Sequence, residues 1–227
     1  MEKNVLDALT DEARSIHARL SALCETDDEI RALYRGASLW FSPVAENPDV
    51  MFLGINPGAA FYKTNHALCA FFEPMEIMEY ADDSQSYQLK WEWQYVFGEK
   101  GLNRPDILAS SVKTNFCYLA TDDAASLRKL LTQIRGKLDI APYEVFGKWT
   151  RQVVQQIAPR LLICEGKDAL DLLRTWSFKA EYEEEPPVHG MQRGHIGSTK
   201  VLQVSRVYST LKDADKIIAE IGNILDI

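Results

Sequence analysis

Four short apolar segments, separated by longer stretches of helical periodicity, constrain the fold of this 227-residue chain more than any other feature. Each is rich in Val, Ile or Leu, which favours strands buried on both faces. They occupy Val50–Leu53, Ile107–Thr114, Arg160–Cys164 and Lys200–Ser205. Strands that alternate with helices form parallel sheets covered on both sides. The sequence therefore predicts an α/β protein, a three-layer α/β/α sandwich around a central, mainly parallel four-stranded sheet.

Helical patterns fill most of the intervals between these segments. Apolar residues recur at helical spacing from Val5 to Leu33, so residues 1–40 are expected to form an N-terminal helical segment packed on the core. Four later helices are predicted over Leu127–Leu138, Val145–Ile157, Asp168–Trp176 and Ala214–Leu225. With 46% hydrophobic and 26% charged residues, the composition is typical of a single globular domain, here residues 1–227.

Composition also limits the class of protein. No apolar stretch approaches the roughly 18 residues of a membrane span, and the amino terminus lacks the pattern of a signal peptide, so a cytoplasmic protein without a membrane partner is expected, as a monomer. Four cysteines lie far apart without a C-x-x-C pair, so we expect free thiols and predict no metal site and no cofactor. The formal net charge of −8 disfavours non-specific coating of nucleic acid. A local basic face around Arg193, His195 and Lys200 remains compatible with it.

Ligands of parallel sheets bind beyond the carboxyl ends of the strands, so those ends are the places to look for chemistry. The insertion over residues 61–104 is rich in aromatic residues and is expected to form a lid or pocket wall. The acidic stretch Glu181–Glu185 is interpreted as a solvated loop.

The first strand end reads Gly54-Ile55-Asn56-Pro57-Gly58, a turn whose glycines permit close approach of a ligand. This motif resembles the G-[MI]-N-P-G motif of the single-strand-selective monofunctional and mismatch-specific branches of the uracil-DNA glycosylase superfamily. The resemblance implies that Asn56 is catalytic and positions the water that attacks the sugar C1′. It also implies that Gly54, Ile55, Pro57 and Gly58 line the substrate site. An amide suits the role of Asn56, because it orients water without repelling nearby phosphates.

A second match covers Thr114-Asn115-Phe116-Cys117-Tyr118-Leu119, which is similar to the N-x-C-P-L segment of the superfamily with Tyr118 in place of proline. The resemblance implies that Asn115 binds the substrate by reading the edge of a flipped base, since an amide carries one donor and one acceptor. An alternative is an asparagine that caps a turn at the strand end.

Two further stretches extend the resemblance. The segment from His66 to Phe72 is similar to an H-G-L-C-F stretch whose phenylalanine stacks on the extruded base, with one residue inserted here, so Phe71 or Phe72 is the equivalent ring and Phe71 is preferred. The stretch from Pro159 to Leu170 resembles the strand, turn and helix that follow in these enzymes, which implies DNA binding by Gly166 and Lys167 at a helix start.

The final H-P-S or N-P-S motif of the superfamily is not matched. The equivalent stretch, Val204 to Leu211, has no histidine, asparagine or proline. Alignment on the strand places Arg206 at the histidine position, where a permanent cation would stabilise the departing base, whereas alignment backwards from Leu211 places Val207 there. An arginine paired with Asp213 on the surface is the alternative. Ser209 and Leu211 are expected to bind DNA, the latter as a wedge, and His189 and His195 are candidates for the missing function.

Together these features lead to the hypothesis of a monofunctional DNA base glycosylase that hydrolyses the N-glycosidic bond of a flipped uracil or modified base, with DNA as its partner. No lysine matches a nucleophile of the superfamily, so strand cleavage through a Schiff base is not expected. Three alternatives stay open: a glycosylase for modified or foreign bases, a catalytically inactive nucleic-acid-binding protein of the same fold, and an unrelated α/β enzyme acting on a phosphorylated small molecule.

Overall fold

A computed structural model describes residues 3–58, 68–207 and 210–227. Its centre is a mixed six-stranded sheet in the spatial order β4-β2-β6-β9-β8-β7. The first four of these strands are mutually parallel, whereas β8 and β7 form an antiparallel hairpin on the edge beside β9. In chain order the strands are β2 (Val50–Gly54), β4 (Val112–Asn115), β6 (Leu161–Glu165), β7 (Tyr182–Val188), β8 (Met191–Ile196) and β9 (Thr199–Val204).

The prediction of an α/β protein is confirmed, but the prediction of a four-stranded sheet is wrong. The two extra strands include most of the acidic stretch Glu181–Glu185, interpreted from the sequence as a solvated loop, because β7 begins at Tyr182. The side chains of β7 are exposed or half-buried, and two of its glutamates lie opposite basic residues of β8: Glu183 pairs with His195 and Glu185 with Arg193 in the strand register. These cross-strand charges offset the repulsion within the acidic run.

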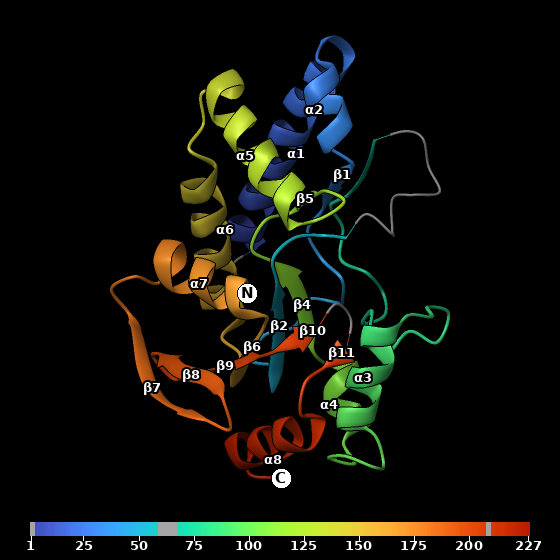
Figure 1. Ribbon diagram of the computed structural model, residues 1–227, viewed down its shortest axis with the longest axis vertical. Coiled ribbons are helices and arrows are strands. Elements are labelled where there is room, and N and C mark those ends of the chain that lie inside the picture. The colour runs from blue at the N-terminus through green and yellow to red at the C-terminus, as the bar shows by residue number, and fades with distance from the viewer. Residues whose placement is uncertain (1–2, 59–67, 208–209) are drawn as a thin grey trace.

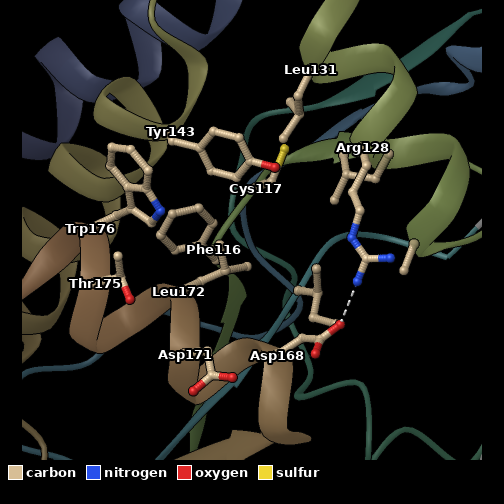
Figure 2. A pocket seen from close by; sticks show the side chains of 13 residues that line it. Phe116, Cys117, Arg128, Leu131, Tyr143, Asp168, Asp171, Leu172, Thr175 and Trp176 are labelled. Carbon is tan, nitrogen blue, oxygen red and sulfur yellow. Dashed lines mark hydrogen bonds and ion pairs between the residues drawn. The ribbon is translucent and has the colours of Figure 1, made fainter.

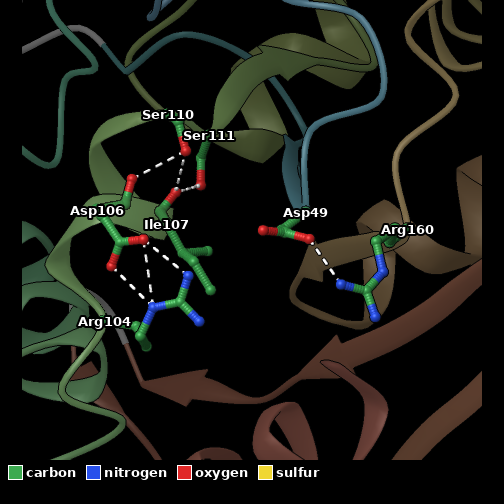
Figure 3. A network of polar contacts seen from close by, with 7 residues as sticks. All are labelled: Asp49, Arg104, Asp106, Ile107, Ser110, Ser111 and Arg160. Atoms are coloured by element: carbon green, nitrogen blue, oxygen red, sulfur yellow. Dashed lines mark hydrogen bonds and ion pairs between the residues drawn. The ribbon is translucent and has the colours of Figure 1, made fainter. Parts of the chain in front are cut away.

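The second predicted strand is also wrong in part. Residues Pro105–Ala109 form a short helix, α4, which begins with proline at its first turn, where a missing backbone N–H costs nothing. The strand β4 begins only at Val112. Ser110 and Ser111 between them hydrogen-bond back to carbonyl groups of α4 and end the helix (Figure 3).

Alternate residues of the central strand β2 enter two separate hydrophobic clusters. Met51 and Leu53 belong to one cluster, while Val50 and Phe52 belong to the other, because successive side chains of a strand point to opposite faces. All five residues of β2 are buried. The sheet therefore lies between two groups of helices (Figure 1).

Five helices and a π-helical turn pack on the first cluster: α1 (Lys3–Thr26), α2 (Asp28–Leu33), α5 (Ala124–Leu138), α6 (Pro142–Ile157), α7 (Lys167–Leu172) and η2 (Leu173–Ser177). The helices on the other face are α3 (Gln88–Phe97), α4 and α8 (Ala214–Leu225). These elements match the predicted N-terminal helical hairpin and the four later predicted helices closely. Among the described helices, none is both long and apolar enough to cross a membrane.

Two small sheets complete the fold. One has the order β3-β1-β5 and is formed by β1 (Gly36–Ser38), β3 (Cys69–Phe71) and β5 (Leu119–Ala120). The other is the hairpin of β10 (Arg206–Val207) and β11 (Thr210–Leu211), which follows β9 directly. Cys24, Cys117 and Cys164 are buried free thiols, as the sequence predicted, and Cys69 is half-buried.

The aromatic insertion contributes to the core as well as to a pocket wall. Of its part described from Leu68 onward, Trp93 and Phe97 of α3 are fully buried against Phe52, with ring centroids 4.8 and 6.4 Å from that of Phe52. Tyr80 lies edge-on to the same ring at 5.3 Å. The interpretation of residues 61–104 as a lid is therefore too narrow, because α3 is a structural helix of the second cluster.

Polar contacts hold together the segments at the amino-terminal ends of the parallel strands (Figure 3). Arg160, just before β6, forms an ion pair with Asp49 at 2.8 Å and donates a hydrogen bond to the carbonyl oxygen of Leu225 at the end of α8. Arg104 holds Asp106 through both side-chain oxygens. Surface ion pairs thus hold the amino-terminal ends of the strands together. The open side of the sheet is at the carboxyl ends of the strands.

Replacing Phe52 with alanine is expected to lower the free energy of unfolding by about 3–5 kcal/mol, because the change removes a buried ring that contacts three other aromatic side chains. Urea denaturation followed by circular dichroism measures it. The matched control is Ile77→Ala, since Ile77 is 54% exposed and its truncation is expected to change stability by less than about 0.5 kcal/mol. Equal losses for both variants would contradict the assignment of Phe52 to the core.

Candidate active site

A cavity of about 570 Å³ opens where the parallel strands β4, β2 and β6 end. The whole first motif, Gly54–Gly58, lines it, together with Asn115 from the end of β4 and Arg206 from β10. Sequence analysis had selected these residues from three separate stretches of the chain. The structure brings them into one cavity.

Gly54 allows two neighbouring strand ends to approach each other. It pairs in register with Asn115, and a Cβ atom placed on Gly54 would lie 2.2 Å from Oδ1 of Asn115 and 3.6 Å from Oε2 of Glu165. The first distance is well inside van der Waals contact, so only glycine permits this position of Asn115. Gly58, by contrast, has no atom within 4 Å of an added Cβ.

Hydrogen bonds fix the orientation of the Asn56 amide. Its Nδ2 donates to the carbonyl oxygens of Pro57 at 3.1 Å and Leu119 at 3.4 Å, and to Oγ1 of Thr121 at 3.1 Å. Carbonyl oxygens only accept, so the atom that faces them must be the NH₂ group. The remaining atom, the acceptor Oδ1, is on the opposite side of the amide. Asn56 therefore carries an immobilised hydrogen-bond acceptor within the cavity lining.

Asn115 is 5% exposed and ends β4. Its backbone carbonyl accepts from the indole of Trp149 at 3.3 Å, whereas no hydrogen bond of its side chain to another described residue is present. The alternative interpretation, an asparagine capping a turn, is thus not what this part of the structure shows. A donor and an acceptor are left for a ligand.

Arg206 is half-buried in β10 and lines the same cavity. It forms no ion pair with the described residues, and Asp213, its proposed surface partner, pairs with Lys216 instead at 3.5 Å. Val207, the alternative at this position, is 48% exposed and does not line the cavity. Among the described residues of this stretch, Arg206 is therefore the one that lines the cavity.

Two tyrosines and an ion pair form the opposite wall. Lys113 of β4 pairs with Glu79, and its ammonium lies 3.9 Å from the centroid of the Tyr80 ring. Burial, together with the negative charges of Glu165 and Glu79, raises the pKa of Tyr80 far above its ordinary value. Burial and Glu79 likewise raise the pKa of Tyr87. Both hydroxyls are therefore protonated at neutral pH, and that of Tyr80 donates a hydrogen bond to Glu165.

Sequence analysis did not select Glu165, the last residue of β6. Its side chain is 3% exposed, lines the cavity, and accepts hydrogen bonds from Tyr80 and Trp93. The available signal was a charged residue directly after the buried run Leu161–Cys164, at a strand end. A carboxylate in such a position is rarely buried without a function or a partner.

The prediction for Phe71 does not hold in this structure. Phe71 lies on β3, is 41% exposed and is not among the residues that line the cavity. In the small sheet, Phe71 pairs with Ser38 of β1, outside the central sheet whose strand ends hold Asn56 and Asn115. Of the three aromatic residues in the wall, Tyr87 is half-buried, whereas the ammonium of Lys113 lies over the rings of both Tyr80 and Phe41, 3.9 and 5.4 Å from their centroids.

The residues expected to bind DNA are not assembled around the cavity. Leu211 is 5% exposed and packs in the second hydrophobic cluster, so its side chain is not presented as a wedge. The backbone N–H of Gly166 is donated to the carbonyl oxygens of Cys164 and Val204 rather than left for a phosphate. Lys167 is exposed and does not line the cavity. Ser209 lies outside the described residues.

The suggested basic face is neutralised by acidic neighbours. Arg193 pairs with Glu220 at 2.7 Å and with Glu185 at 3.4 Å, and Lys200 pairs with Glu185 at 3.0 Å. His195 also faces Glu185. His189 is exposed in the turn between β7 and β8, and neither histidine lines the cavity that contains Asn56. Neither histidine replaces the missing final motif.

A second, smaller cavity of about 230 Å³ lies between α5, α6 and α7, and shares Ile55 and Ala124 with the first. Figure 2 shows its lining, in which Trp176 of η2 stacks on Tyr143 at 5.2 Å between ring centroids, and Arg128 pairs with Asp168 at the mouth. Most of the remaining lining is apolar. Asn56, Asn115 and Arg206 all belong to the first cavity.

Comparison with models of known protein families and with curated proteins finds no match for this chain. Within the described residues, no three His, Cys, Asp or Glu side chains are grouped so as to hold a metal ion. The functional assignment therefore depends on the geometry of the cavity.

Gly54→Ala is expected to displace Asn115 and to lower the free energy of unfolding by about 1–3 kcal/mol, because the new methyl group overlaps Oδ1 of Asn115. Urea denaturation and a crystal structure of the variant measure the two effects. Gly58→Ala is the matched control, since the same methyl group meets open space there. If Gly54→Ala were as stable as Gly58→Ala and left Asn115 in place, the close approach of the Asn115 side chain to Gly54 would be refuted.

Proposed function

We propose that this chain is a monofunctional DNA base glycosylase of the uracil-DNA glycosylase superfamily, which hydrolyses the N-glycosidic bond of a flipped base. The observation that carries the proposal is the meeting of Asn56, Asn115 and Arg206 in one cavity at the carboxyl ends of β4, β2 and β6. The parallel run β4-β2-β6-β9 supports it, because ligands of parallel sheets bind beyond the carboxyl ends of the strands.

The orientation of Asn56 suits the role of holding water. Because Nδ2 donates its hydrogen bonds to Pro57 and Thr121, Oδ1 is left to accept a hydrogen bond from a water molecule. This hydrogen bond directs the water oxygen towards the sugar C1′. An amide removes no proton, so the reaction depends on departure of the base. The N-glycosidic bond breaks with its electron pair on the base, positive charge develops on the sugar, and the water oxygen then bonds to C1′. The proton that water loses reaches the base through solvent.

Arg206 supplies the charge that this route requires. The departing base is an anion, and a guanidinium in the same cavity stabilises it in the transition state. Asn115 holds the base through the donor and acceptor of its side-chain amide, and Tyr87 offers a ring for stacking. The side chains for binding, water positioning and charge stabilisation are thus all present in one cavity.

Oligonucleotides that carry uracil, xanthine, hypoxanthine or hydroxymethylated pyrimidines test the proposal directly. After incubation with the protein, alkali cleaves the strand at any abasic site. Release of at least one base supports the glycosylase. Binding without release from any substrate would instead favour a catalytically inactive nucleic-acid-binding protein.

Asn56→Ala is expected to reduce the rate of base release by about 100-fold or more while leaving oligonucleotide binding nearly unchanged, because the amide positions water and its other hydrogen bonds are made within the protein, to Pro57, Leu119 and Thr121. Single-turnover kinetics separate the two effects. The matched control is Asn223→Ala, an exposed asparagine on α8. Full activity of Asn56→Ala would refute the assigned role.

Arg206→Gln is expected to slow base release by about 10² to 10³-fold with little change in the dependence of binding on salt, if the guanidinium acts on the base. A phosphate contact would give the opposite pattern: the slope of log affinity against log salt would fall by about one charge, and single-turnover rates at saturation would stay the same. Binding titrations between 50 and 200 mM salt distinguish the two.

A further inference from the structure

Glu165 offers a second polar group to whatever base the cavity holds. In the parallel pairing of β2 with β6, Leu53 lies opposite Cys164, so Glu165 comes next to Gly54. The carboxylate is 97% buried yet lines the cavity. The Glu165 carboxylate therefore lies near Asn115, close to the space above Gly54 that a side chain would otherwise fill.

The two oxygens of this carboxylate have different surroundings. Oε1 accepts from the hydroxyl of Tyr80 at 2.5 Å and from the indole N–H of Trp93 at 2.9 Å, and both of these side chains are fully buried. Oε2 accepts no hydrogen bond from the described residues and lies 3.6 Å from the point above Gly54 that a Cβ would occupy. Tyr80 and Trp93 thus fix the side chain, and one acceptor is left facing the ligand space.

A carboxylate oxygen accepts hydrogen bonds and donates none, so it selects a ligand that presents a donor. The pairing edge of uracil or thymine has two carbonyl oxygens around one N–H. Cytosine and adenine present an exocyclic amino group, and carboxylates are known to accept from the amino group of cytosine. A carbonyl oxygen placed against Oε2 would be repelled, because two acceptors face each other without a proton between them.

We propose that Glu165 is a specificity-determining residue that makes this cavity select a base with an exocyclic amino group over uracil. The inference rests on the proposed function for the identity of the ligand as a base. Oε2 of Glu165 accepts from the amino group, while the amide of Asn115 pairs with the adjacent ring nitrogen or carbonyl.

Equilibrium binding of free cytosine, adenine, uracil and thymine, followed by ligand-observed NMR, tests the proposal without requiring catalysis. The wild-type protein is expected to bind cytosine or adenine about 10- to 100-fold more tightly than uracil or thymine. Replacing both amino hydrogens, as in N4,N4-dimethylcytosine, is expected to abolish this preference. Tighter binding of uracil, or no detectable binding of any base, would overturn the proposal.

Glu165→Gln provides the second arm. The amide oxygen of glutamine can still accept from Tyr80 and Trp93, and its NH₂ group then replaces Oε2 as a donor, so the preference is expected to shift towards uracil by at least tenfold. Glu99→Gln, at an exposed site, is the matched control. Unchanged selectivity of a folded Glu165→Gln variant would refute the role of Oε2, and if that variant does not fold, the dimethylcytosine comparison decides.

The same data separate this inference from the proposed function. Selective binding of amino-bearing bases, with no release from cytosine-, adenine- or uracil-type oligonucleotides, would leave the role of Glu165 standing and remove the glycosylase. Preferential release of uracil that Glu165→Gln does not change would support the glycosylase and refute the role of Glu165.

Discussion

The close approach of Asn115 to the backbone of Gly54 is the contact on which the rest of the site depends. The parallel register of β2 and β4 places these residues opposite each other at the edge of the sheet, and the missing Cβ lets Oδ1 of Asn115 reach a point that any other side chain would fill. Oε2 of Glu165 comes near the same point from β6. Three adjacent strands thus end in a glycine flanked by two hydrogen-bonding side chains, and the strand spacing of a regular sheet fixes how far apart they lie.

Most of the charged side chains that line the cavity are held by an ion pair or by hydrogen bonds within the protein. Glu79 is neutralised by Lys113, Asp122 pairs with Arg35, and Asp123 accepts from the backbone at the start of α5. Of the carboxylates in the lining, Glu165 is held by the neutral donors Tyr80 and Trp93. Arg206 has no ion-pair partner in the described part of the chain. One carboxylate and one guanidinium are therefore left to act on a ligand, although the protein as a whole is strongly acidic.

Sequence periodicity predicted the α/β class and most helices, because β2 and β6 are short, mostly apolar runs between amphipathic helices. It missed the hairpin of β7 and β8, since Glu183 and Glu185 resemble a solvated loop until their cross-strand partners are known. At the site, local motifs led to Asn56, which follows the buried strand β2, and to Asn115, which ends the buried strand β4. Glu165 and Phe41 carry no such motif and reach the cavity through long-range packing, and Leu211 resembled a wedge only because its burial under α3 and α8 is a tertiary effect.

In the proposed reaction, Arg206 and Glu165 act on the same base, because both line the cavity that holds it. A carboxylate beside a departing base opposes the negative charge that develops as the bond breaks. A neutral histidine or asparagine offers only a dipole against that charge. A guanidinium remains a full cation at every accessible pH, and its attraction for an anion exceeds that of a dipole. Under the proposed function, a carboxylate that selects the base therefore requires a stronger group for its departure, and Arg206, in the same cavity, carries the positive charge.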